Sequence, residues 1–183
     1  MNGREDNIKI GQASLADIEN IIDLWLEFVK HHSRIDAKLE LDENACSYYR
    51  NYLNTLLHKD TTGAFVAKDK EKCIGYILGG LKQCPQPLKQ YNYGLIAELY
   101  VDDNYRKLKI GKELLERIEE WFKLKNVKYI EVDVFSENEE GVAFWKNSRY
   151  KTKRYIMRKE ITALQFLEKE FINYEEERDF HNF

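Results

Sequence analysis

Proline and glycine are scarce in this chain, which has two prolines and nine glycines in 183 residues. So few breakers, with 43% hydrophobic residues, exclude a collagen-like or disordered chain and indicate a globular protein. Nowhere do about 18 apolar residues follow one another without charge, so we expect no membrane span. The first ten residues also lack the apolar stretch of a secretory signal. We therefore predict a cytoplasmic protein with no membrane partner.

Cysteine and histidine are also rare. The three cysteines, Cys46, Cys73 and Cys84, form neither a CxxC pair nor an even set, which favours reduced thiols over a disulfide framework or a zinc site. His31 and His32 are adjacent in the sequence and would point in different directions on a helix. The sequence therefore predicts no metal site.

An excess of positive charge is missing as well. The 29 basic and 32 acidic residues give a net charge of −3, which argues against nucleic acid as the main partner. The acidic excess lies in the last segment, 162–183, which holds six acidic and two basic residues beside a narrow apolar stripe of helical spacing. We predict one domain over 1–161 and an acidic C-terminal helix over 162–183.

The hydrophobic pattern predicts an α/β fold of the mixed (α+β) kind. Apolar residues recur at helical spacing after Ser14 and again from Ala45 to Leu56, and runs typical of strands alternate with helices later in the chain. We expect a mixed central sheet of about six strands flanked by helices and a C-terminal helical appendage. The expected strands are 8–13, 63–69, 72–82, 93–102, 129–135 and 150–161, and the two later helices are 109–125 and 138–147.

A short basic loop precedes the helix at 109–125. Arg106, Lys107, Lys109 and Lys112 crowd the start of that helix, where the positive end of the helix dipole disfavours cations unless an anion is bound. A solvated charged turn is the alternative interpretation. A P-loop is rejected, because Arg106 stands where that motif needs glycine and Glu113 replaces its Ser or Thr.

At this loop the sequence resembles the GNAT superfamily of N-acetyltransferases, whose fingerprint is Gln/Arg-x-x-Gly-x-Gly/Ala after a hydrophobic strand. Arg106 and Gly111 match its ends, and Lys109 replaces its middle glycine. The segment SENEEGVAFWKNSRY is similar to a second family motif. The resemblance implies an N-acetyltransferase that uses acetyl-CoA and no metal. The residues implied to bind the cofactor are Leu99, Tyr100, Val101, Arg106, Lys107, Leu108, Lys109, Ile110, Gly111, Lys112, Asn138, Phe144 and Trp145.

The catalytic candidates come from a strand and from tyrosines. Alternation along 93–102 places Glu98 on one face with Ile96 and Tyr100, and a buried Glu98 would have the raised pKa that suits a general base. An exposed or salt-bridged strand Glu is the alternative. Trp145 stands where the family usually has the tyrosine that protonates the leaving thiolate. Tyr150 is our candidate acid, with Tyr100, Tyr155 and ordered water as alternatives.

Acceptor recognition is predicted in the polar stretch 30–42, expected as a loop or broken helix. Trp25, Phe28, His32 and Asp36 are the candidate substrate residues there. A polyamine, an amino acid, an antibiotic or a protein N-terminus would all suit the resemblance, which also implies a homodimer. Two other hypotheses stay open: a non-catalytic acyl-CoA sensor, and an RNA-associated protein that uses the basic loop.

Overall fold

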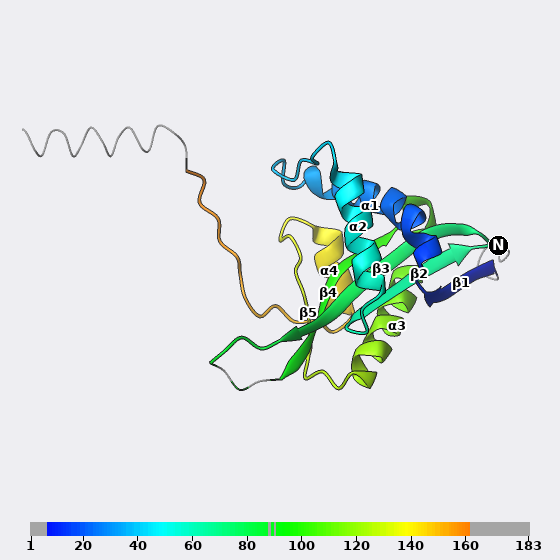
Figure 1. Cartoon of the computed structure of the whole chain (residues 1–183). Coiled ribbons are helices and arrows are strands. Elements are labelled where there is room, and N and C mark those ends of the chain that lie inside the picture. Colours follow the sequence, from blue (N-terminus) through cyan, green and yellow to red (C-terminus); the bar gives the residue numbers. More distant parts are fainter. Residues whose placement is uncertain (1–6, 88, 90, 162–183) are drawn as a thin grey trace, which may run out of the picture. The chain divides into compact units, whose positions relative to one another are not determined.

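A computed structural model describes residues 7–87, 89 and 91–161, and the chain divides into two units, 1–149 and 150–183. In the first unit five strands form one sheet in the order β1-β2-β3-β4-β5 (Figure 1). The first four pair antiparallel, and β5 runs parallel to β4. Their bounds are Ile8–Gln12 for β1, Thr62–Asp69 for β2, Lys72–Gln83 for β3, Asn92–Val101 for β4 and Ile130–Val132 for β5.

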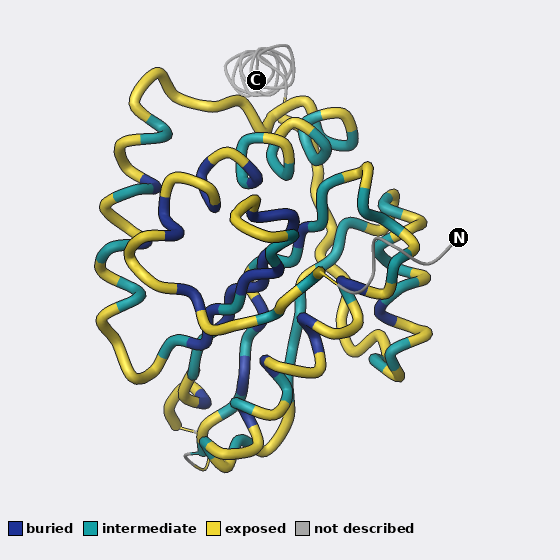
Figure 2. Tube along the Cα trace, turned by 90° about the vertical axis from the view of Figure 1, so that its right-hand side faces the viewer, coloured by how far each residue is buried: buried dark blue, intermediate teal, exposed yellow. Residues whose placement is uncertain are grey.

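Helices cover both faces of this sheet. On one face α1 (Ile18–Ser33) and α2 (Ala45–Leu57) bury a common apolar core with β2, β3 and β4. On the other face α3 (Ile110–Leu124) lies against β2, β3 and β4, and α4 (Glu139–Asn147) follows β5. Figure 2 shows the buried residues gathered along the central strands. The predicted mixed sheet flanked by helices is confirmed.

The first helix begins as the sequence predicts. Before the short 3₁₀ helix η2 (Leu15–Asp17), the Asp17 carboxylate accepts hydrogen bonds from the backbone N–H and the hydroxyl of Ser14, both at 2.8 Å. This is a capping box, which satisfies donors at a helix start. Asp17 is buried and also forms an ion pair with Lys68 of β2, so the cap ties α1 to the sheet.

Two glycines of the sheet face helix α3 and leave no room for a side chain between sheet and helix. A Cβ atom on Gly94 would lie 2.7 Å from the ring of Phe122, and one on Gly79 would lie 2.8 Å from Ile118. Any larger side chain at either position would push the helix away. The close approach keeps the apolar side of α3, including Leu114 and Leu115, fully buried.

A β-bulge at Ala97 divides β4 into two parts. Leu78 of β3 lies opposite Glu98, whereas the next residue, Gly79, lies opposite Ile96. Ala97 is therefore an extra residue, and the side chains after it change face. Ile96 points toward α3 with Gly79, whereas Glu98 and Tyr100 point toward α1 and α2. The prediction that all three share a face is wrong, because strict alternation does not allow for a bulge.

Two further predictions need correction. Residues 150–161 form no strand, so the described part of the chain has five strands and not six. This segment carries its apolar side chains in one run, with Tyr155, Ile156 and Met157 all highly exposed, and it lacks the alternation that would give a strand a buried face. The stretch 30–42, expected as a loop or broken helix, is confirmed as such, because it is helical as far as Ser33 and has no helix or strand from 34 to 42. The predicted strand 129–135 forms only over Ile130–Val132.

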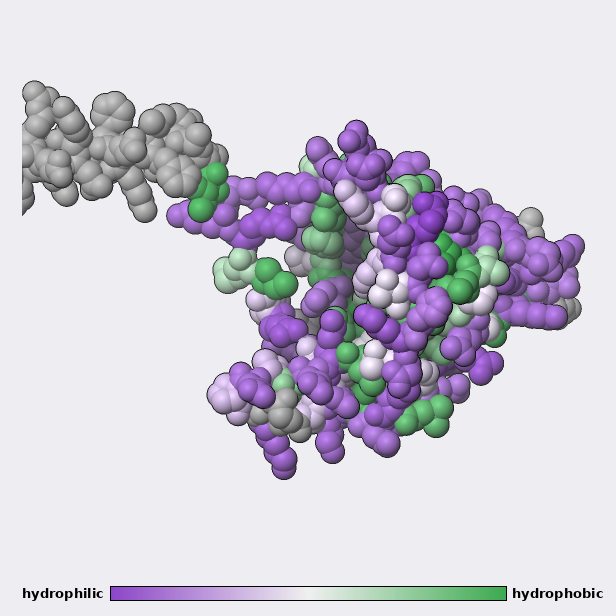
Figure 3. Space-filling view, in the orientation of Figure 1, coloured by the Kyte–Doolittle hydropathy of each residue, from purple (hydrophilic) through white to green (hydrophobic). Residues whose placement is uncertain are grey.

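The acidic helix predicted over 162–183 lies outside the described residues. No helix in the described ranges is both long and apolar enough to cross a membrane. Figure 3 shows hydrophilic side chains over most of the face drawn there.

Candidate active site

A cleft opens where β4 and β5 separate. The two strands pair only between Gly94–Ile96 and Ile130–Val132, and β4 then continues to Val101 while the chain after Val132 leaves the sheet. Backbone groups of β4 beyond Ile96 that face β5 therefore stay outside the sheet's hydrogen bonding. The cleft has a volume of about 910 Å³ and is lined by β4, the segment after β5, the end of α1, the start of α3 and α4.

Glu98 lies at the edge of this cleft with its carboxylate directed into the α1 and α2 side of the molecule. Its Oε2 accepts hydrogen bonds from the hydroxyls of Tyr49, at 2.6 Å, and Tyr76, at 2.8 Å. Burial raises the pKa of Glu98 above its ordinary value, and the two hydroxyls oppose that rise. Burial also raises the pKa of both tyrosines, with the Glu98 charge adding to it, so they remain hydrogen-bond donors.

Aromatic side chains surround this carboxylate. Trp25 of α1 stacks on Tyr49 with 4.1 Å between ring centres, and Phe28 meets Tyr100 edge to face at 6.3 Å. His32 packs on Phe28 and also contacts Phe135, which follows β5. Helix α1 therefore crosses from the β4 side of the cleft to the β5 side.

The predicted substrate residues divide into two groups. Phe28 and His32 line the cleft, together with the neighbouring His31. Burial lowers the pKa of His31, and the nearby His32 and Arg106 lower it further, which favours a neutral imidazole. Trp25 and Asp36 are not among the cleft-lining residues; Asp36 instead accepts the backbone N–H of Lys38 at 3.2 Å. All four stay predictions as substrate contacts.

The basic loop reaches α3 through two left-handed residues, Lys107 with φ 66° and Lys109 with φ 63°. The carbonyl of Lys109 accepts the amides of Lys112 and Glu113, whereas the amides of 107–111 have no acceptor within the described ranges. A helix start with free amides and several cations suits an anion. Residues 105–107 and 109–112 line the cleft.

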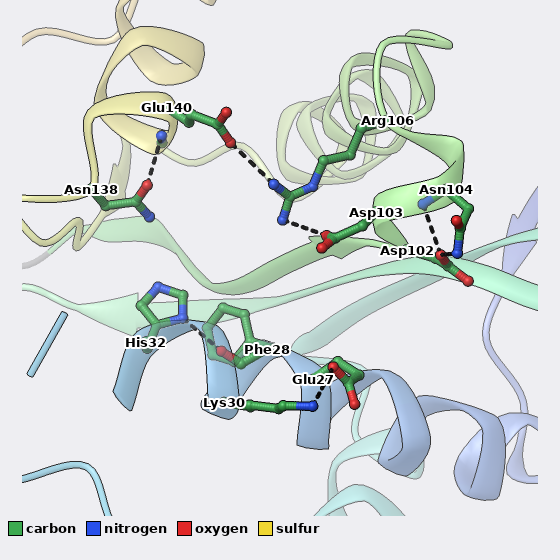
Figure 4. A network of polar contacts seen from close by, with 11 residues as sticks. Glu27, Phe28, Lys30, His32, Asp102, Asp103, Asn104, Arg106, Asn138 and Glu140 are labelled. Carbon is green, nitrogen blue, oxygen red and sulfur yellow. Dashed lines mark hydrogen bonds and ion pairs between the residues drawn. The ribbon is translucent and has the colours of Figure 1, made fainter. Parts of the chain in front are cut away.

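Arg106 is held by two carboxylates within this region. Its guanidinium lies 3.0 Å from Glu140 in the first turn of α4 and 2.8 Å from Asp103 (Figure 4). Asn138 caps the same helix, its Oδ1 accepting the amide of Gly141 at 2.9 Å. The start of α3 also lies close to Phe144 in the second half of α4, since a Cβ atom on Gly111 would be 3.6 Å from the Phe144 ring.

The sequence model of the acetyltransferase (GNAT) family matches residues 20–148, which include every cleft-lining residue except Arg149. The chain belongs to this family. A protein named as an uncharacterized N-acetyltransferase from Methanocaldococcus jannaschii is 21% identical over 140 residues, covering 76% of this chain. The chain spans 59% of that relative's length.

Solved structures share the GNAT fold. A mutant of the BH1408 protein from Bacillus halodurans superimposes with a TM-score of 0.74 at 22% identity, covering 84% of this chain and 99% of that one. An aminoglycoside N-acetyltransferase in complex with CoA gives a TM-score of 0.66 at 14% identity, covering 85% and 95%. At these identities the likeness shows the fold alone.

Two residues that replace glycines of the GNAT motifs adopt the left-handed backbone conformation that glycine favours. Lys109 replaces the middle glycine and adopts φ 63°, and Arg149 replaces the glycine of the second motif and adopts φ 70°. Left-handed backbone is unfavourable for residues with a Cβ atom. Lys109 therefore holds a strained backbone conformation at the start of α3.

The other predicted cofactor residues lie on or beside the cleft. Leu99, Tyr100, Val101, Asn138, Phe144 and Trp145 line it, whereas Leu108 does not. Trp145 is 9% exposed and contacts Phe144 edge to face. Their part in binding a cofactor stays a prediction.

Of the three tyrosines proposed as the acid, only Tyr100 belongs to the unit that forms the cleft. Tyr150 and Tyr155 belong to the second unit, so their roles stay predictions. Tyr100 lies in the first unit beside the cleft, and burial, with the Asp103 charge second, raises its pKa to about 12. No cluster of three metal-ligating side chains occurs in the ranges that the structure describes.

Sequence reasoning missed three residues of this site. The sequence does not single out Tyr49 or Tyr76, because a hydroxyl that contacts Glu98 follows no motif and no fixed spacing. Glu140 was not considered, although a carboxylate at the first turn of a helix near a basic loop is a signal for an ion pair.

Proposed function

We propose that the protein transfers the acetyl group of acetyl-CoA to a primary amine of a small molecule or protein. The observation that carries this proposal is that Glu98 and the basic loop before α3 line the same cleft. Its β4 wall holds a partly buried carboxylate with a raised pKa, and its α3 end holds a cationic helix start. Membership of the GNAT family supports acetyl transfer, and an aminoglycoside N-acetyltransferase of the same fold is named in complex with CoA.

The α3 loop suits the diphosphate of CoA. The amides of 107–111 would hold phosphate oxygens, with Lys107, Lys109 and Lys112 as counter-charges. The pantetheine would lie along the open edge of 98–101, where backbone groups have no β5 partner. Acetyl-CoA supplies the activated acyl group as its thioester.

Glu98 serves as the general base in this proposal. It takes one proton from the substrate ammonium, and the neutral nitrogen then attacks the acetyl carbonyl carbon, forming a C–N bond as the C–S bond breaks. A β4 amide polarises the carbonyl oxygen. The leaving thiolate takes a proton from Tyr150, our sequence candidate, or from Tyr100 or water, and the second proton that the acetylated nitrogen releases restores that donor. No metal takes part.

Calorimetric titration with acetyl-CoA, CoA and ATP tests the donor site first. We expect micromolar binding of the two CoA species and none of ATP. A panel of primary amines scored by thiol release then tests turnover, with Glu98→Gln as the variant that should lose it. Absence of CoA binding by folded, CoA-free protein would overturn the proposal.

A non-catalytic acyl-CoA sensor is the second candidate, and Trp145 favours it. An indole N–H is a poor proton donor to a thiolate, and this one lies buried beside the cleft where the family usually has tyrosine. CoA binding without thiol release for any amine would support the sensor. Location in the cytoplasm and assembly as a homodimer remain part of the proposal.

A further inference from the structure

The Glu98 carboxylate is held in an asymmetric way. Tyr49 comes from α2 and Tyr76 from β3, yet both hydroxyls donate to the same oxygen, Oε2, at 2.6 and 2.8 Å. No described residue donates a hydrogen bond to the other oxygen, Oε1. Since Glu98 lines the cleft, one oxygen is committed to the protein and one is left for a ligand.

Both tyrosines are fixed by packing. Tyr76 is fully buried in the central strand, and Tyr49 is 7% exposed with its ring stacked on Trp25 of α1. Their hydroxyls therefore cannot turn to water when the carboxylate changes its charge. Two rigid donors fix the side-chain torsion of Glu98 much as supporting residues fix a metal ligand.

We propose that Tyr49 and Tyr76 are positioning residues that hold Glu98 by Oε2 and present Oε1 to the acceptor amine. The role of Oε1 toward an amine rests on the proposed function, whereas the hydrogen bonds to Oε2 do not. The ammonium proton moves to Oε1, Glu98 becomes neutral, and the two tyrosine protons stay on their own oxygens. The tyrosines neither contact the substrate nor transfer a proton.

The groups around Glu98 make this arrangement testable. Helix α2 contributes Tyr49 and, farther off, Tyr52, whose pKa is raised first by burial and then by the Glu98 charge. Strand β3 contributes Tyr76, and the nearby α1 side chain is the neutral Trp25. No cation in the described ranges perturbs Glu98. The two hydroxyls are therefore the groups that favour its charged form.

A direct titration of Glu98 gives the test. The side-chain carboxyl carbon of Glu98 is followed by ¹³C NMR in protein with labelled glutamate, and Glu98→Gln assigns the signal. Each hydroxyl stabilises the carboxylate, so Tyr49→Phe and Tyr76→Phe should each raise the titration midpoint by about one pH unit. Tyr52→Phe, on the same helix and without a hydrogen bond to Glu98, is the matched control and should leave it unchanged.

Kinetics add a second measurement. With the fastest acceptor of the amine panel, the rising limb of the pH–rate profile should move to higher pH in both variants, while the affinity for acetyl-CoA stays unchanged. Unshifted NMR midpoints in both variants, or an equal shift in Tyr52→Phe, would overturn the inference. Shifted midpoints in a protein that acetylates no amine would instead support the positioning and reject the proposed function.

Discussion

Arg106 joins the loop before α3 to the first turn of α4, with its Nη1 atom 3.0 Å from Oε2 of Glu140. Its Nη2 atom lies 2.8 Å from Oδ1 of Asp103. Both carboxylates are mostly exposed, so each pair contributes only about 0–1 kcal/mol to stability. Two negative groups nevertheless offset the charge that this arginine can offer to a phosphate.

We expect Glu140→Gln to tighten CoA binding, because it removes a negative charge from the cleft and leaves Arg106 less neutralised. The gain should be about two- to fivefold at low salt, corresponding to about 0.4–1 kcal/mol, and should shrink at high salt. Arg106→Ala should weaken binding, also mostly at low salt. Calorimetric titration at two salt concentrations measures both. Weaker binding by Glu140→Gln would mean that the pair positions the loop.

Burial of Glu98 predicts that stability falls as pH rises. Burial raises the pKa of Glu98 in the folded protein above its value in the unfolded chain. Between those two pKa values the folded protein binds more protons than the unfolded chain does. Protonated Glu98 contributes its full stabilisation below the pKa that it has in the unfolded chain. This contribution is lost as pH rises through the pKa that it has in the folded protein. Glu98→Gln should therefore gain stability relative to the parent with rising pH, by about 1.4 kcal/mol per unit of pKa elevation.

Urea unfolding at pH 4.5 to 8 measures this difference. Glu43→Gln, at an exposed position, is the control. The difference between its free energy of unfolding and that of the parent should stay constant over the same pH range. If the difference for Glu98→Gln is also constant, the Glu98 carboxyl has the same pKa in the folded protein as in the unfolded chain, which contradicts the prediction.

Lys109 combines backbone strain with charge, and two substitutions separate them. Lys109→Ala removes the charge and keeps a Cβ atom at φ 63°, whereas Lys109→Gly removes both. The glycine variant should be more stable than the alanine variant by about 1 kcal/mol, and the two should lose CoA affinity alike. Thermal or urea unfolding and calorimetry report the two properties. A more stable alanine variant would contradict the strained loop.

Gly141 has no room for a side chain. A Cβ atom there would lie 2.7 Å from Nδ2 and 2.9 Å from Cγ of Asn138, so Gly141→Ala should displace the cap of α4. We expect a loss of about 1 kcal/mol of unfolding free energy and weaker CoA binding, since Asn138 lines the cleft. Gly11→Ala, where nothing lies within 4 Å, is the control. Unchanged stability in Gly141→Ala would mean that the cap can move at no cost.

Periodicity predicted the elements of the first unit well. Helix α3 was expected over 109–125 and lies at Ile110–Leu124, and β2 and β3 were placed to within one residue at each end. These segments are long and have one apolar face, and a buried face is what a hydrophobic pattern records. In α2 the pattern overshot, because Tyr48 and Tyr52 fit the apolar stripe but are 65% and 48% exposed.

The site was harder to predict because its contacts join residues far apart in the chain. The charges of the α3 loop can be read from the sequence, yet Glu140, one of the two carboxylates that hold Arg106, lies 34 residues later. Tyr49 lies 49 residues before Glu98. Pattern and motif describe neighbours in sequence, whereas the contact of the two hydroxyls with the carboxylate depends on how one helix and two strands pack.

The bulge at Ala97 decides which face of β4 carries Glu98, the proposed base. Side chains along a regular strand alternate between its two faces, so without a bulge Glu98 would share the α3 face with Ile96. The bulge absorbs the extra residue, so Glu98 stays opposite Leu78 and its carboxylate reaches both tyrosine hydroxyls. In a regular strand of the same sequence the carboxylate would lie under α3, and the two hydroxyls on the opposite face would be left facing one another.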